Sequence, residues 1–128
     1  MAERDIRTFE EFWPFYVRQH ANETNRALHF VGTTLFMATT AAGILTGRRA
    51  LFLAGPLFGY GFAWVGHFVF EGNKPASWKY PAWSFRGDLV MWWKIATGTM
   101  NAEVARVVKS NGVEHEAPPR DIAASQAN

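Results

Sequence analysis

The sequence predicts an all-α fold: a small integral membrane helical bundle with a central antiparallel transmembrane hairpin and flanking amphipathic helices. Residues 27–47 and 50–70 are long runs without a formally charged side chain. A helix of about 20 apolar residues is long enough to cross a bilayer. Only Arg48 and Arg49 separate the two runs, so two such helices would run antiparallel through a short turn.

The composition bears on the choice between a membrane protein and a soluble one. Aromatic residues make up 16% and charged residues 19% of the chain, which is aromatic-rich and charge-poor for a soluble domain. The mean hydropathy of -0.12 points the other way, because polar ends dilute the two apolar runs. A soluble bundle with two buried helices remains an alternative, since threonine and glycine lower the hydrophobicity of the first run. Pro56 and the glycines favour the bilayer, where small residues let helices approach closely.

Other protein classes are disfavoured by charge and composition. The net charge is +2 and the basic residues are scattered, so we expect no nucleic-acid partner. The chain has no cysteine, so a metal would have to be bound by His, Asp, Glu or Asn. The first residues, MAERDIRTFEEF, are charged and contain no apolar core, so we expect no cleavable signal peptide.

The first expected element is a helix over residues 8–20. Thr8 and Glu11 fit a capping box. Aromatic side chains then recur at helical spacing, and His20 ends this stripe. Pro14 lies too deep for a first-turn proline, so the helix should be kinked or should begin later than the cap indicates.

The elements after the second apolar run are less regular. Residues 72–85 contain prolines, a glycine and aromatics, which predicts an irregular interfacial loop with an aromatic belt. Residues 86–108 have an amphipathic period and predict one helix on, or partly in, the membrane. Residues 110–128 are polar and without period, so we expect a disordered tail after a single domain over residues 1–109.

The basic residues predict an orientation in the membrane. The turn between the runs carries only Arg48 and Arg49. The opposite end carries more: Arg18, Arg26, Lys74, Lys79 and Arg86. The positive-inside rule therefore places that end, and both termini, in the cytoplasm.

Three of the four histidines map to this same end. His29 opens the first apolar run and His67 closes the second, so antiparallel pairing would put them at one depth. His20 lies nine residues before His29, and on one continuous helix their rings would face opposite sides. Asn22 and Asn25 are good N-cap residues, so a helix break between the two histidines would let the rings converge.

The resulting constellation is typical of a metal site. His20, His29 and His67 would supply imidazoles. Glu71, four residues after His67 on the same helical face, or Asp88 would add a carboxylate. Imidazole plus carboxylate with open positions suits non-haem Fe(II), and Zn(II) or Mn(II) fits nearly as well. Taken singly, each histidine is more often a packing residue. Together they are harder to dismiss, because ionisable groups at membrane depth are costly.

Two motifs resemble a known family. One is H-x4-N-x3-H continued as HFVGT at the entry of the first run, and the other is G-H-x-x-F-E-x-x-x-P-A at the exit of the second. Together they are similar to the membrane family that includes the fungal 2-hydroxy fatty acid dioxygenase, over roughly residues 9 to 100. One departure is Ser77-Trp78 after Pro75-Ala76, where fungal-type members continue with a leucine.

The resemblance implies an activity and a set of functional residues. The activity is Fe(II)-dependent α-oxidation, converting a 2-hydroxy fatty acid and dioxygen to the fatty acid one carbon shorter. His20, His29 and His67 would be catalytic iron ligands with Glu71 beside them, and Asn25 would orient the His29 ring. Apart from the resemblance, the residue pattern alone adds Asp88 as a supporting carboxylate.

Two other functions stay open from the sequence: a non-enzymatic membrane scaffold and a zinc-dependent lipid hydrolase. For the dioxygenase, the acyl chain would lie along the small-residue seam of the hairpin or in the bilayer. Arg26, Arg86 or Lys74 would pair with the substrate carboxylate.

Overall fold

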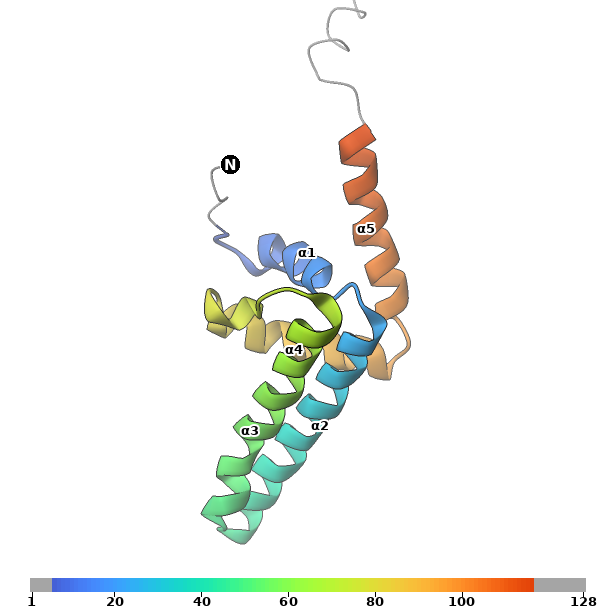
Figure 1. The fold of residues 1–128 in the computed structure, drawn as a ribbon. Coiled ribbons are helices and arrows are strands. Elements are labelled where there is room, and N and C mark those ends of the chain that lie inside the picture. Colours follow the sequence, from blue (N-terminus) through green and yellow to red (C-terminus); the bar gives the residue numbers. More distant parts are fainter. Residues whose placement is uncertain (1–5, 117–128) are drawn as a thin grey trace, which may run out of the picture.

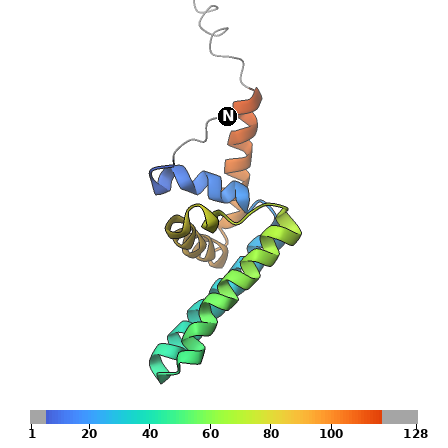
Figure 2. The same ribbon diagram turned by 60° about the vertical axis from the view of Figure 1, so that its left-hand side comes forward.

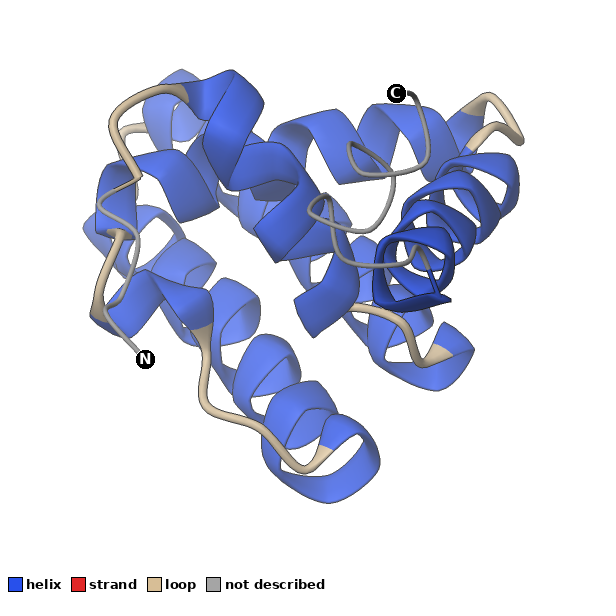
Figure 3. Ribbon diagram, turned by 90° about the horizontal axis from the view of Figure 1, so that it is seen from above, coloured by secondary structure: helices blue, strands red, loops and turns tan. Residues whose placement is uncertain are grey.

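The computed structural model describes the backbone of residues 6–116 and the side chains of residues 6–109. Within these residues the chain is helical and has no strand (Figure 3), so the all-α class is confirmed. The elements are α1 (Phe9–Gln19), α2 (Glu23–Thr46), α3 (Arg49–Val65), a π-helix that continues α3 (Gly66–Glu71), a short 3-10 helix (Ala76–Trp78), α4 (Pro81–Ala96) and α5 (Met100–Glu116).

Helices α2 and α3 lie side by side and form a long hairpin that projects from the rest of the molecule (Figures 1 and 2). Gly47 ends α2 with a φ of 69°, a left-handed conformation that glycine adopts without strain. Small residues let the two backbones approach. A Cβ placed on Gly43 would lie 2.5 Å from the backbone nitrogen of Phe52, and one on Gly55 would lie 2.5 Å from Oγ1 of Thr40. At these positions the seam is therefore filled by the helices themselves and leaves no room for an acyl chain.

The buried hydrophobic core lies outside the hairpin. Helices α1 and α4 lie across the open end of the hairpin, and α5 extends in the opposite direction (Figure 1). The aromatic stripe of α1 is buried against α4 and α5, and the core consists of Phe12, Trp13, Tyr16, Val17, Ala76, Met91, Met100 and Val107. The predicted capping bond is present, with the backbone nitrogen of Glu11 donating to Oγ1 of Thr8 at 3.2 Å. Helix α1 continues through Pro14.

Two helices are long and apolar enough to cross a membrane: Glu23–Thr46, with a mean hydropathy of 1.5, and Arg49–Glu71, with 1.2. Only 22% and 17% of the residues in their most apolar 18-residue stretches are buried. Large apolar side chains stand exposed along both, among them Leu45 at 85% and Leu57 at 76%.

The structure differs from the sequence prediction after residue 71. The loop expected over residues 72–85 is shorter, because Pro81 begins α4 at the first helical position, where its missing N–H is no loss. The single helix expected over 86–108 is two helices. Gly98 takes a φ of 76°, and the nitrogen of Thr99 donates to the carbonyl oxygen of Lys94 at 2.8 Å, which closes α4. Helix α5 continues to Glu116, into the segment expected to be disordered, and residues 117–128 of that segment lie outside the described residues.

Candidate metal centre

The structure brings His20, His29 and His67 together. One ring nitrogen of each lies within 4.8 Å of the corresponding nitrogens of the other two. All three side chains are buried, with 1%, 4% and 2% of their surface exposed. Among the described residues this is the group of His, Asp or Glu side chains placed to hold a metal ion.

The break between His20 and His29 is fixed by local hydrogen bonds. Helix α1 ends at Gln19, and Asn22 caps α2 by accepting from the backbone nitrogens of Thr24 and Asn25. The Arg26 guanidinium donates to the carbonyl oxygens of His20 at 2.8 Å and of Ala21 at 2.6 Å. This turn carries His20 back over the start of α2, so the two rings meet although they are nine residues apart.

Each of the three rings has an oxygen acceptor at Nδ1. The acceptors are the carbonyl oxygen of Tyr16 for His20 at 2.7 Å, the carbonyl oxygen of Asn25 for His29 at 3.0 Å, and Oδ1 of Asn73 for His67 at 2.7 Å. An oxygen acceptor holds the proton on Nδ1 and leaves a lone pair on Nε2. This arrangement is typical of metal-binding histidines, whose second ring nitrogen donates to a carbonyl or carboxylate.

The free Nε2 atoms fit a cation between them. Nε2 of His20 and Nε2 of His29 are 3.2 Å apart. With both protons held on Nδ1, no proton is left to make this contact a hydrogen bond, so the two lone pairs repel one another unless a positive charge lies between them. Burial, together with the neighbouring His29 and His67, lowers the pKa of His20 well below its usual value. The ring is therefore neutral, as a metal ligand must be.

Glu71 lies outside this cluster, contrary to the expectation that it would face the metal with His67. Residues 66–71 form a π-helix, whose wider turn rotates Glu71 away from the position that α-helical spacing predicts. Its Oε1 accepts a short hydrogen bond from the backbone nitrogen of Asn22 and a weaker one from Nδ2 of Asn25 at 3.4 Å. Glu71 therefore joins the end of α3 to the start of α2.

Asn25 contacts the His29 ring through its backbone carbonyl oxygen, which accepts from Nδ1 of His29. The side chain packs against Gly66, where an added Cβ would lie 1.9 Å from Oδ1 of Asn25. Gly66 therefore allows α2 and the π-helix to come close enough for their histidines to meet.

Asp88 does not belong to the histidine cluster either, but it is linked to it through Tyr16. The Tyr16 hydroxyl donates a short hydrogen bond to Oδ1 of Asp88, and the Tyr16 ring stacks on His20 with centroids 4.0 Å apart. Burial raises the pKa of Asp88 to about 7, against the opposing effect of the Tyr16 hydrogen bond.

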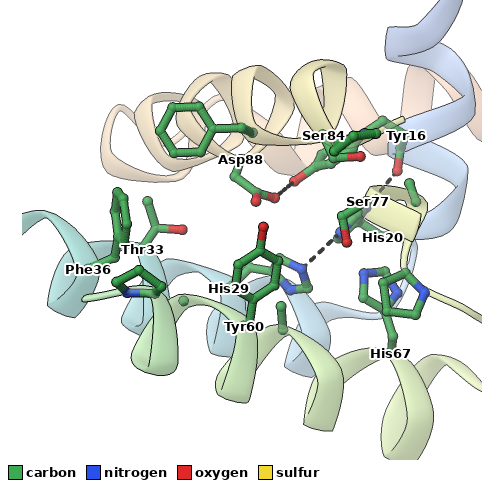
Figure 4. A pocket seen from close by; sticks show the side chains of 17 residues that line it. Tyr16, His20, His29, Thr33, Phe36, Tyr60, His67, Ser77, Ser84 and Asp88 are labelled. Atoms are coloured by element: carbon green, nitrogen blue, oxygen red, sulfur yellow. Dashed lines mark hydrogen bonds between the residues drawn. The ribbon is translucent and has the colours of Figure 1, made fainter. Parts of the chain in front are cut away.

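A cavity of about 270 Å³ lies between the hairpin and α4 and includes all three histidines (Figure 4). The rest of its polar lining consists of Tyr16, Thr33, Tyr60, Ser77, Ser84 and Asp88. Among the described residues no lysine or arginine lines it, so the three cations expected to pair with a substrate carboxylate lie elsewhere. Arg26 is occupied by backbone carbonyls, Arg86 lies over the Phe9 ring at 4.2 Å from its centroid, and Lys74 is exposed.

Two residues of the site were missed by sequence reasoning. Asn73 accepts from the His67 ring although it lies six residues further along the chain, a spacing that does not place two side chains on one helical face. It reaches the ring because the chain reverses at Gly72, which has a φ of 71°. Tyr16 is one of the aromatic residues at helical spacing in residues 8–20, a pattern that predicts packing and gives no sign of a role at the site. The one signal for it was its position four residues before His20, where a helical carbonyl can accept from a side chain that follows.

The fold and the site together define a class: an all-helical protein with a buried three-histidine centre at the open end of an apolar hairpin. A family model described as 2-hydroxy-palmitic acid dioxygenase Mpo1-like matches residues 6–100, and the chain belongs to this Mpo1-like family. Neither the curated proteins nor the solved structures contain a significant match.

Proposed function

We propose that this protein is an Fe(II)-dependent dioxygenase of lipid α-oxidation, which converts a 2-hydroxy fatty acid and dioxygen to the fatty acid one carbon shorter. The observation that carries the proposal is the convergence of three buried imidazoles with their Nδ1 protons already bound. Membership of the Mpo1-like family supplies the class of reaction.

His20, His29 and His67 would hold the ion through Nε2. A site of imidazoles with open positions suits non-haem iron, and zinc is the nearest competitor. When bound, iron would supply the redox chemistry that allows dioxygen to react. The protein's own part is to orient the rings through Tyr16, Asn25 and Asn73, while burial lowers the pKa of His20, which keeps that ring neutral, and keeps bulk water out. In this proposal Glu71 is not a metal ligand; it joins the end of the second span to the start of the first.

The size of the cavity determines how a long-chain substrate would lie. Pockets that enclose a drug-sized ligand measure about 300–1,000 Å³, whereas this cavity measures about 270 Å³. It accommodates the polar head and the first carbons only. Exposed residues frame its outer side, namely Pro56 and Tyr60 on α3 with Pro81 and Phe85 on α4. We therefore place the rest of the acyl chain in the bilayer, reached between α3 and α4.

The exposed apolar surface of the hairpin supports membrane insertion. A core helix of a soluble protein is mostly buried, whereas α2 and α3 expose large apolar side chains along their length. We propose that both helices span the bilayer with the histidine end in the cytoplasm. The chain has no cysteine, so one introduced thiol reports orientation. In intact cells an impermeant maleimide should label the Ala50→Cys protein at the turn and not the Glu10→Cys protein on α1; the reverse pattern would refute the orientation.

The decisive experiment combines metal analysis with oxygen uptake. Protein purified without oxygen should contain about one iron per chain and should consume oxygen when 2-hydroxypalmitate is added. Stoichiometric zinc without oxygen uptake would favour a lipid hydrolase. Absence of any stoichiometric metal, together with tolerance of alanine at all three histidines, would leave a membrane scaffold.

A further inference from the structure

Asp88 is a carboxylate of the cavity lining that does not join the histidine cluster. It lines the cavity from α4, on the far side from His29 and His67 (Figure 4). In the part of the chain that the structure describes, no arginine or lysine lines the cavity to neutralise it. A carboxylate in such surroundings is costly unless hydrogen bonds compensate it, and one bond is present, from the Tyr16 hydroxyl to Oδ1.

The position of Asp88 relative to the histidines is fixed through Tyr16. That residue holds Asp88 with its hydroxyl, His20 with its carbonyl oxygen and the His20 ring by stacking. Gly87 allows the close approach, because a Cβ there would lie 2.9 Å from the Tyr16 ring. The carboxylate is thereby held at a set position relative to the His20 ring, as a group that recognises a substrate must be.

The second oxygen of Asp88 remains available. The described hydrogen bonds use Oδ1 only, and the side chain is only partly buried because it faces the cavity. A carboxylate oxygen in an apolar cavity is a strong acceptor for a hydroxyl. A 2-hydroxy acid differs from an ordinary fatty acid by one such hydroxyl, located next to its carboxyl group.

We propose that Asp88 accepts a hydrogen bond from the 2-hydroxyl of the substrate and so selects 2-hydroxy acids over unsubstituted fatty acids, with Tyr16 as its positioning residue. This assignment rests on the proposed function, since it presumes a fatty acid head beside the histidines. It gives Asp88 a role distinct from metal ligation.

A purely structural role for Asp88 makes a different prediction. The Tyr16–Asp88 bond docks α4 on α1, and Glu103 makes a similar bond, accepting from Nε1 of Trp13 at 2.7 Å and docking α5 on α1. Glu103 does not line the cavity. It therefore serves as the matched control: a carboxylate bound to an aromatic side chain of α1, but remote from the substrate.

The test is equilibrium binding without turnover, with zinc-loaded protein in nanodiscs and 2-hydroxypalmitate or palmitate as the probe. The quantity measured is the ratio of the two dissociation constants. The wild-type protein should prefer the hydroxy acid by about tenfold or more, the usual worth of a hydrogen bond to a charged group. The Asp88→Leu substitution should abolish the preference for the hydroxy acid. The Asp88→Asn substitution keeps an accepting oxygen and should retain part of the preference. The Tyr16→Phe substitution should reduce it. Glu103→Leu should leave the ratio unchanged.

The outcomes separate failure of this inference from failure of the proposed function. General distortion of the site weakens both ligands together and leaves the ratio intact. A wild-type preference that persists in Asp88→Leu therefore refutes the role of Asp88 while the dioxygenase assignment stands. A wild-type protein that binds neither acid refutes the proposed function itself.

Discussion

The two ends of the α2–α3 hairpin are held together in different ways. At the turn end the helices meet through glycine: a Cβ on Gly43 would lie within 2.5 Å of the Phe52 backbone, and the outer faces expose Leu45 and Leu53. At the histidine end the contacts are polar and specific. Each imidazole has its own acceptor, and Glu71 joins one helix to the start of the other.

The difference shows which parts of the molecule the site depends on. The turn end needs only α2, α3 and small residues at their seam. The histidine end also needs α1, which supplies His20 and the Tyr16 carbonyl, and the loop after α3, which supplies Asn73. A change at the turn end should therefore affect stability, and one at the histidine end should also affect metal binding. Metal affinity measured across a series of variants tests this division.

The largest effect is expected from removing a ligand. His67→Ala leaves two imidazoles, and the metal dissociation constant should rise by more than about a hundredfold, beyond the cost of losing an outer partner. Competitive titration with a chromophoric chelator measures this, and helical content by circular dichroism shows that the variant is folded. A folded His67→Ala protein with unchanged affinity would mean that the cluster is not the metal site.

The next largest effect is expected at Asn73. In the wild-type protein Oδ1 of Asn73 lies 2.7 Å from Nδ1 of His67. The Asn73→Ala substitution removes this acceptor, so the His67 ring is free to rotate or to change tautomer. Affinity should fall by about 10- to 100-fold. Asn101→Ala is the control, because Asn101 accepts from Arg26 at 3.2 Å and does not line the cavity. Equal effects of the two substitutions would contradict a role for Asn73 in orienting His67.

The sequence predicts the hairpin and the histidine set for clear physical reasons. Uncharged runs, a short basic turn and an Asn N-cap are local signals. Antiparallel pairing then places His29 and His67 at one end without further information. The break before Asn22 is likewise a local capping signal, and it brings in His20.

Other parts of the site depend on geometry that periodicity does not reveal. The α-helical spacing predicts Glu71 beside the metal, whereas the π-helix over Gly66–Glu71 turns it to the start of α2. Asn73 reaches His67 through a reversal at Gly72. The division of residues 86–108 into two helices follows from Gly98, whose positive φ ends α4. In each case the backbone departs from regular α-helical geometry, and the effect on side-chain positions follows only from the three-dimensional structure.

A smaller effect on affinity is expected at Gly66, where backbone packing and the metal site meet. In Gly66→Ala the new Cβ would lie 1.9 Å from Oδ1 of Asn25, which pushes α2 from the π-helix and separates His29 from His67. Overpacking usually costs about 1–3 kcal/mol. A cost in the lower part of that range corresponds to a loss of metal affinity of about tenfold, which is the loss we expect. Gly61→Ala is the control, since nothing lies within 4 Å of its Cβ. If the Gly66 variant binds metal as Gly61→Ala does, the close approach to Asn25 is not what brings the rings together.

The smallest effect on metal affinity is expected at the turn end. Gly43→Ala places a Cβ 2.5 Å from the Phe52 backbone nitrogen, a direct clash with the backbone of the neighbouring helix. It should lower the free energy of unfolding by about 1–3 kcal/mol, because backbone on both sides must shift. Metal affinity of the folded protein should stay within about twofold of wild type, since the clash is several helical turns from His29 and the acceptors at Tyr16, Asn25 and Asn73 are undisturbed. Thermal unfolding in detergent and chelator titration measure the two quantities separately. If metal affinity falls together with the free energy of unfolding, the clash at Gly43 distorts the histidine end as well, and the two ends of the hairpin are not independent.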